Sequence, residues 1–343
     1  MNLGKATALA VDGAMCAMMY AIQRRHRLDS SSAAAIENYI SAHEGSGREA
    51  YFAAPALSPE QHPQFGTLRW PVQVQNERVL KALSQKSPST FNWPSPILTG
   101  FAENDRVHVD LFPCAAGWSA PTVLMLHALM SASDVGYRRW AADFNARGWN
   151  ACFVHLPYHY SRAPRGHWNG ELAITADVVR NAEGLRQGVV ELRQIMALLR
   201  AWGCGEFGVW ASSYGGWIGA LLASVERDFR FVALLEPIVD VEHAIWTSPA
   251  GAALRRELRR WKIAPSLVAR HFPLVSPLHG EVLCGAERVL LCAGTYDLIA
   301  PARDIAELHA RWPGAELLHV AQGHFGYRMM PAVWARLVER GLI

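Results

Sequence analysis

From about residue 97 to the C-terminus, two patterns of hydrophobic residues alternate along the chain. Short apolar runs rich in β-branched and aromatic residues occur at residues 122–127, 151–156, 207–211, 231–235, 288–292 and 316–320. Segments with apolar residues at helical spacing lie between or after them, at residues 137–144, 185–199, 217–225, 301–308 and 331–338. This alternation predicts an α/β fold with a mainly parallel sheet and helices on both faces.

The first part of the chain follows a different pattern. Apolar residues keep helical spacing at 6–22 and 33–43, residues 30–32 can cap the second helix, and prolines at 55, 59, 63 and 71 then interrupt the chain. Residues 97–101 and 107–112 flank a polar turn and predict an antiparallel hairpin. We therefore expect residues 1–90 to be a helical and irregular extension, and residues 91–343 to form the sheet domain.

The apolar segment 6–22 is a candidate for targeting or membrane contact. Asp12 interrupts it, and Arg24 and Arg25 follow. We expect the segment to be too short and too broken to span a membrane, and the charge is atypical of a signal peptide. The spacing indicates an amphipathic helix that packs on the domain, and a helix on a membrane surface is the alternative.

A second segment that does not fit the alternation lies at about residues 240–282. Apolar residues at helical spacing are mixed there with four arginines. This pattern predicts a helical lid inserted into the sheet domain, where lids exclude water and shape a binding pocket. The arginines fit a solvated helix face better than a surface for anionic lipid.

Composition narrows the class of protein. The chain has 343 residues, a net charge of +3 and no long basic block, so nucleic acid is not an expected partner. Its six cysteines are scattered without a CxxC motif, which argues against a zinc site or a disulfide framework and favours a reducing, cytoplasmic location. We expect no metal and no cofactor, and the oligomeric state stays open.

The most informative motif lies between a predicted strand and a predicted helix. Ala211-Ser212-Ser213-Tyr214-Gly215 has the form small-x-Ser-x-Gly, centred on Ser213. A sharp strand-to-helix turn of this form lifts a serine to the top of a sheet, and it needs small residues because backbone segments come close. A helix N-cap is the alternative role for Ser213, and Ser212 is the weaker nucleophile because Trp210 precedes it.

A serine nucleophile needs a base, and the base needs an acid. Asp297 and His324 each follow a predicted strand, in the chain order Ser213, Asp297, His324. This order predicts a catalytic triad, with Glu236 and Asp240 as the second choices for the acid.

A tetrahedral intermediate also needs backbone donors for its oxyanion. We predict the N–H groups of Tyr214, which follows the serine, and Leu129, in the loop after an earlier strand. His127 ends that strand, and we expect it to brace the loop by hydrogen bonding.

These residues resemble the α/β-hydrolases, from about residue 97 to the C-terminus. The similar segments are His127-Ala128-Leu129-Met130, the elbow at residues 211–216, Tyr296-Asp297 and Gly323-His324. The resemblance implies an eight-stranded sheet and hydrolysis through an acyl-serine intermediate without a cofactor. Two departures from the family pattern, Ala128 and Ala211, stand where glycine is usual. The spacing from residues 156–162 to the elbow is similar to the domain-containing-18 branch of these hydrolases, and no substrate is inferred from it.

The loop after residues 151–156 should lie at the same sheet edge as Ser213. We predict that Tyr158, His159 and Arg162 bind substrate, with Arg162 or Arg165 recognising an anionic or polar group. The alternative is that these arginines pair with acids of the protein.

The sequence therefore predicts a serine hydrolase that cleaves a small-molecule carboxylic ester or thioester. Two alternatives remain: a serine peptidase or amidase, and a non-catalytic binding protein that keeps the fold.

Overall fold

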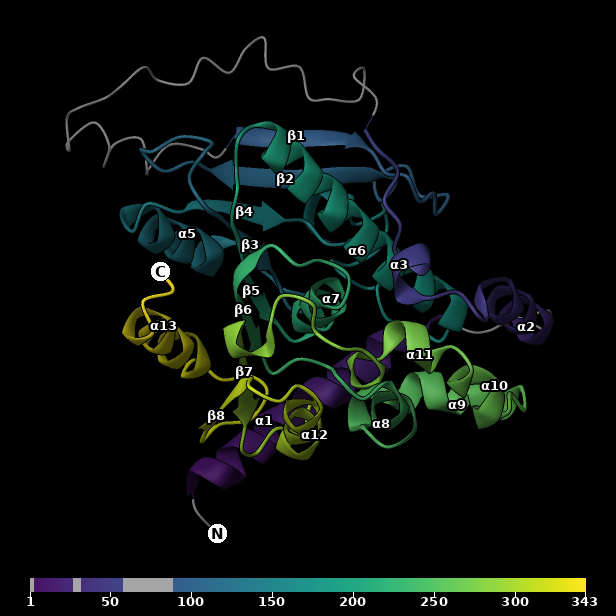
Figure 1. The fold of residues 1–343 in the computed structure, drawn as a ribbon. Helices are drawn as coiled ribbons and strands as arrows, with labels where there is room; N and C mark the ends of the chain where they lie inside the picture. Colours follow the sequence, from purple (N-terminus) through teal and green to yellow (C-terminus); the bar gives the residue numbers. More distant parts are fainter. Residues whose placement is uncertain (1–2, 27–31, 58–88) are drawn as a thin grey trace.

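The computed structural model describes residues 3–26, 32–57 and 89–343 (Figure 1). Within these residues eight strands form one sheet in the order β1-β2-β4-β3-β5-β6-β7-β8, and all pairs from β4 to β8 are parallel. The predicted mainly parallel, eight-stranded sheet is thus confirmed. The strands are β1 Ser89–Pro94, β2 Arg106–Phe112, β3 Thr122–Leu126, β4 Asn150–Val154, β5 Phe207–Ser212, β6 Phe229–Leu235, β7 Val289–Gly294 and β8 Glu316–Val320.

Helices cover both faces of the sheet, as its two apolar faces require (Figure 1). Side chains of α5 (Val135–Ala146) and α13 (Met329–Glu339) share one buried cluster with one face of the sheet. Side chains of α6 (Val178–Ala201), α7 (Tyr214–Ala223) and α12 (Ala302–Arg311) pack with the other face. Every residue of the central strands β3, β4, β5 and β7 is buried, which explains their continuous apolar runs.

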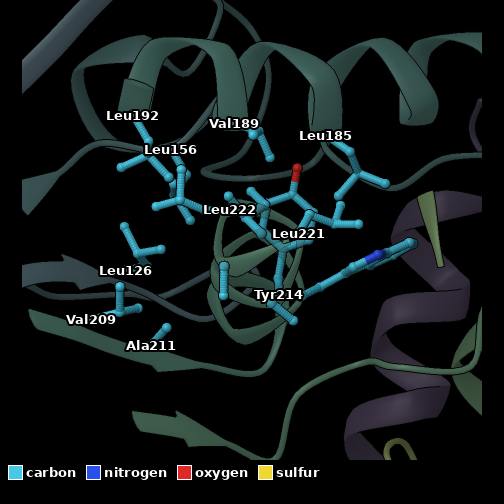
Figure 2. Close-up of a cluster of buried hydrophobic side chains, with 14 of the residues drawn as sticks. Leu126, Leu156, Leu185, Val189, Leu192, Val209, Ala211, Tyr214, Leu221 and Leu222 are labelled. Carbon is cyan, nitrogen blue, oxygen red and sulfur yellow. The ribbon is translucent and has the colours of Figure 1, made fainter. Parts of the chain in front are cut away.

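The core beneath α6 positions the serine turn (Figure 2). Leu126 and Val209 from the sheet, Leu185 and Val189 from α6, and Leu221 from α7 are almost fully buried together. Burying each such side chain contributes about 1.5–3 kcal/mol, so α7 is held firmly against β5. The turn between β5 and α7 therefore has a fixed geometry.

The predicted hairpin partner is wrong. Strand β1 pairs antiparallel with β2, with Ser89 opposite Leu111, whereas residues 97–101 are irregular, with bends at residues 97 and 100. The Asp105 carboxylate accepts hydrogen bonds from the N–H groups of Thr99 at 2.6 Å and Gly100 at 3.1 Å. Gly100 has φ of 82°, so the segment bends where an extended strand was expected.

The N-terminal helices are α1 (Leu3–Gln23), α2 (Ser32–His43) and α3 (Arg48–Tyr51). Helix α1 has 21 residues and a mean hydropathy of 1.2, so it is long and apolar enough to cross a membrane, by criteria that core helices of soluble proteins and signal sequences also meet. The expectation that this segment is too short is therefore wrong. Asp12, in the middle of α1, is fully buried against the rest of the protein. Residues 30 and 31 of the predicted cap, and the prolines at 59, 63 and 71, lie outside the described residues.

The predicted lid insertion is helical and lies between β6 and β7. It contains α8 (Val241–Trp246), α9 (Ala252–Arg260), α10 (Pro265–Ala269) and α11 (Phe272–Val275). Two of the four arginines of α9 are half-buried against the protein: Arg255 donates to the Ile245 carbonyl, and Arg256 pairs with the buried Glu257 at 2.8 Å. The other two, Arg259 and Arg260, are exposed, as expected for a solvated helix face. Helix α9 therefore turns its apolar side inward and its last two arginines outward.

We predict that Phe144→Ala lowers the free energy of unfolding by about 3–5 kcal/mol, because its ring is fully buried and packs edge-on against Trp210 and Trp334. Urea denaturation measures the change. The matched control, Trp168→Ala, removes an aromatic side chain that is 60% exposed and should change stability by less than about 0.5 kcal/mol. Equal losses in the two variants would contradict this account of the core.

Candidate active site

Ser213 occupies the sharp turn between β5 and α7. Its backbone has φ of 53° and ψ of −114°, an unfavourable conformation for a residue with a Cβ, and its N–H donates to the Leu235 carbonyl at 2.8 Å. Local strain of this kind persists only when the surrounding packing enforces it. The turn is the strand-to-helix elbow that the sequence motif predicts.

The turn has room only for small residues, for two different reasons. A Cβ at Gly215 would lie 2.5 Å from the Leu126 carbonyl oxygen, so α7 can approach β3 only with glycine at this position. Ala211 is tolerated where glycine is usual because Gly219 faces it, where a Cβ would lie 3.1 Å from the Ala211 Cβ. The space for this contact is therefore provided by Gly219 on the helix rather than by a glycine at position 211.

The structure brings Ser213, His324 and Asp297 together in a chain of hydrogen bonds. Ser213 Oγ lies 2.8 Å from His324 Nε2, and His324 Nδ1 lies 2.7 Å from Asp297 Oδ2. The other oxygen of Asp297 accepts the N–H groups of Ile299 and Ala300. Because a carboxylate accepts, Nδ1 carries the proton and Nε2 is left to accept the serine proton. All three side chains are nearly buried.

Two further carboxyl groups lie near His324. Burial disfavours a charged imidazole, but the charges of Asp297, Glu236 and Asp12 outweigh it and raise the pKa of His324 to about 9. Burial raises the pKa of the Glu236 carboxyl to about 8, against the influence of His324 and with that of Asp297 and Asp12. Glu236 follows β6 with φ of 44°, and within the described chain its buried Oε2 has no hydrogen-bond partner. Three carboxyl groups therefore surround one base, and the carboxyl of Glu236 becomes charged only above about pH 8.

The loop after β3 presents the predicted oxyanion donors. Tyr214 begins α7, where the N–H has no acceptor inside the helix, and the N–H of Leu129 has none in the described part of the chain. The next N–H, that of Met130, is already used, because it donates to His159 Nε2 at 3.1 Å. Met130 has φ of 54°, so the backbone bends at this residue. The prediction that the N–H of Leu129, rather than that of Met130, is an oxyanion donor is consistent with this geometry.

Two histidines brace that loop. His127 Nδ1 donates to the Ala128 carbonyl at 2.9 Å, and its Nε2 accepts the Leu156 N–H at 3.1 Å. Burial holds the pKa of His127 well below its ordinary value, so the ring is neutral and can accept. His127 therefore has the bracing contacts that the sequence predicts.

A largely apolar cavity of about 180 Å³ adjoins these groups. Ser213, His324, Leu129, Tyr214 and Glu236 all line it. Most of the remaining wall consists of aliphatic and aromatic side chains from α1, α2, α6 and the lid insertion, among them Met19, Ile36, Leu185, Ile245, Leu254 and Phe272. The nucleophile thus faces a space suited to a hydrocarbon group.

The structure does not support the predicted substrate-binding residues. In the part of the chain described, Tyr158, His159 and Arg162 are all buried and none lines the cavity. Arg162 forms two hydrogen bonds to the buried Glu191, at 2.5 and 2.9 Å. His159 braces the Met130 N–H and so acts on the loop rather than on a ligand. These side chains lie at the expected edge but point into the protein, where paired polar groups replace contact with water.

Groups of metal-binding residue types do occur among the described residues. His108, Asp110 and His155 lie close together, but the two imidazole rings stack at 4.3 Å with an angle of 20° between their planes. The lone pairs of stacked rings run nearly parallel and do not converge on one ion. Another such group consists of Glu236, Asp297 and His324, in which His324 is already committed to Ser213.

Sequence analysis missed Asp12 and placed Glu236 only as a second choice for the acid. Asp12 interrupts an apolar helix, and a charge at a position in register with the buried Cys16 and Met19 is itself a signal of a specific partner. The partner could not be named, because it lies at the other end of the chain.

Comparison with known proteins supports the fold. No protein-family model matches the chain, and no curated protein sequence does. Among solved structures, the chain is similar to acetyl xylan esterase from Paenibacillus sp. R4, with a TM-score of 0.52 and 15% identity over 78% of this chain and 96% of that one. Acetyl xylan esterase 1 from Thermoanaerobacterium sp. JW/SL YS485 has a TM-score of 0.52 and 15% identity over 76% and 90% of the two chains.

A third similar structure is the acylaminoacyl peptidase from Pyrococcus horikoshii. Its TM-score is 0.53, with 16% identity over 78% of this chain but only 44% of the peptidase. Identities this low establish the fold alone. Together with the sheet order and the serine turn, they show that the chain has the α/β-hydrolase fold.

We predict that Arg162→Ala lowers the free energy of unfolding by about 3–5 kcal/mol, because it leaves the Glu191 carboxylate buried and unpaired. Chemical denaturation measures this change. The control is Arg165→Ala, whose side chain is 95% exposed, and its stability should stay within about 0.5 kcal/mol of the parent. Unchanged stability in Arg162→Ala with a raised KM would restore the substrate-binding interpretation.

Proposed function

We propose that the protein is a serine hydrolase that cleaves carboxylic esters or thioesters through an acyl-serine intermediate. One observation carries the proposal: Ser213, His324 and Asp297 form a continuous chain of hydrogen bonds at the mouth of a strained strand-to-helix turn. The similarity of the fold to two acetyl xylan esterases supports the same class of reaction.

The geometry suits a two-step mechanism. Ser213 Oγ attacks the carbonyl carbon while His324 Nε2 takes its proton, and Asp297 stabilises the imidazolium that forms. The N–H groups of Leu129 and Tyr214 donate to the oxyanion. His324 then protonates the departing alcohol or thiol, and a water molecule, activated by the same ring, hydrolyses the acyl-serine.

The cavity favours an apolar acyl group. Most of its wall is apolar, and the further polar side chains that line it, Gln23, Tyr39, Asn181, Ser248 and His271, carry no opposite charge for an anionic acyl chain, which would therefore lose its hydration without compensation. A hydrocarbon chain has no hydrogen bonds to water to lose, and its transfer from water to an apolar cavity is favourable. Medium or long acyl chains are therefore the proposed substrates, with the alcohol or thiol portion directed toward solvent.

The two alternatives make different demands on the site. A non-catalytic binding protein does not need the nucleophile, base and acid to be aligned, whereas here both hydrogen bonds are 2.8 Å or shorter. Amide cleavage uses the same groups, and the similarity to an acylaminoacyl peptidase keeps it as the second candidate. A panel of matched esters, thioesters and amides separates the candidates.

We predict that a fluorophosphonate probe labels the native protein and that Ser213→Ala abolishes both labelling and hydrolysis of p-nitrophenyl esters. The expected loss of kcat is at least about a thousandfold. Ser212→Ala is the matched control, because its hydroxyl is also buried and contacts Tyr137 rather than His324. Labelling of Ser213→Ala to the same extent as the native protein would refute the assignment.

We also predict that activity rises with pH. Because His324 must be neutral to accept the serine proton and its pKa is raised to about 9, kcat/KM should increase up to about pH 9, by as much as about tenfold per pH unit. Ester hydrolysis corrected for the uncatalysed rate measures the profile. Glu236→Gln removes a carboxyl group that is charged above about pH 8, and it should therefore move the rise to lower pH. A plateau already reached at about pH 7 would contradict the prediction.

A further inference from the structure

Asp12 connects the N-terminal helix to both loops that carry the proposed base and acid. Its carboxylate, which is fully buried, accepts the N–H of His324 at 3.0 Å and the N–H of Leu298 at 3.1 Å. The Phe325 N–H lies 3.4 Å from the same carboxylate. Leu298 follows Asp297 in the loop after β7, and His324 lies in the loop after β8. One side chain therefore cross-links the two loops through their backbones.

The base loop is shaped to receive this carboxylate. A Cβ at Gly323 would lie 2.8 Å from Asp12 Oδ1, so the residue before His324 has to be glycine for Asp12 to reach the backbone. One turn along α1, Cys16 is also buried, and burial together with the charges of Asp12 and Asp297 raises the pKa of its thiol to about 11. The carboxylates of Asp12 and Asp297 are thus both close enough to Cys16 to raise the pKa of its thiol.

The rest of α1 is anchored independently of this contact. Arg256 of the lid helix α9 donates to the Tyr20 hydroxyl at 2.8 Å, and its guanidinium lies 5.5 Å from the centre of the Tyr20 ring. Met19 and Gln23 line the cavity. Packing at the C-terminal end of α1 therefore holds Asp12 at a fixed depth below the base loop.

We propose that Asp12 is a positioning residue for His324, which sets the separation of the base and acid loops and adds negative charge beneath the imidazole. The proposal rests on the proposed function for its kinetic consequences, but its structural consequence does not depend on turnover. It makes α1 a functional part of the site, although helix and site are separated by most of the chain.

The groups that face His324 from neighbouring elements define what removing Asp12 can do. Asp297 after β7 and Glu236 after β6 remain in an Asp12 variant, and the Cys16 thiol on α1 stays neutral. The loss of one charge out of three should therefore lower the pKa of His324 only in part. We expect a shift of about half a pH unit.

The test uses two substitutions that remove different properties of Asp12. Asp12→Asn keeps one carbonyl acceptor but loses the charge, and Asp12→Ala loses both. In histidine-labelled protein, NMR titration of the His324 ring, assigned with His324→Gln, should show a pKa lower by about half a unit in Asp12→Asn than in the parent. An unchanged pKa in Asp12→Asn would overturn the proposal whether or not the protein turns over substrate.

Kinetics give the second readout. In Asp12→Asn the rise of kcat/KM with pH should move to lower pH by the same amount as the titration. In Asp12→Ala, loss of the cross-link should lower kcat by about 10- to 100-fold with little change in KM, because small displacements of a base slow proton transfer more than they weaken binding. A fall in kcat for Asp12→Ala no larger than that for Asp12→Asn would contradict the positioning role.

Asp110→Asn is the matched control for loss of a buried carboxylate. Asp110 is 6% exposed and pairs with Thr90 and His155, outside the cavity. It should lower stability and leave the His324 titration and kcat unchanged; an equal shift in this variant would count against a specific role for Asp12. If the parent protein shows neither labelling nor ester hydrolysis, the proposed function fails, while the NMR titration still decides the role of Asp12.

Discussion

The two hydrogen bonds of His324 are the interaction on which the arrangement of the site depends. They join a serine at the end of β5, an aspartate after β7 and a histidine after β8, so three separate loops must meet at one edge of the sheet. Parallel strands make this meeting possible, because their carboxyl ends all lie at that edge. The firm packing of α7 against the sheet then keeps the serine in its strained conformation.

Burial disfavours the charged forms of both His324 and the carboxyl groups around it, and each effect has to be offset by other interactions. An imidazole that must gain a proton inside an apolar site is destabilised by burial, and the surrounding carboxylates offset that effect. The carboxylates are themselves buried, and backbone N–H groups satisfy those of Asp297 and Asp12. Among the described residues, one oxygen of the Glu236 carboxyl has no hydrogen-bond partner, and burial raises the pKa of this carboxyl to about 8.

The cavity and the loops around it are built from parts that lie far apart in the sequence. The lid insertion and the helices α1 and α2 provide apolar walls. The loop after β3 is held in place by His159, which follows β4, and by its own His127, which accepts the Leu156 N–H. Because polar side chains of this region form hydrogen bonds within the protein, they do not line the cavity, whose wall is mostly apolar. Arg162, which was predicted to bind substrate, likewise pairs with Glu191 inside the protein.

The sequence by itself determined the strand and helix alternation, the serine turn and the order of Ser213, Asp297 and His324, because local periodicity and the residues at strand ends specify these features. It predicted a strand at residues 97–101, where the Asp105 carboxylate and Gly100 bend the chain, and so it missed β1. It also could not pair Arg162 with Glu191. Only the tertiary structure decided that Asp12 lies beneath His324. That contact joins residues 312 positions apart, and it exists because the packing of a whole helix, not any local pattern, carries the carboxylate to the loop.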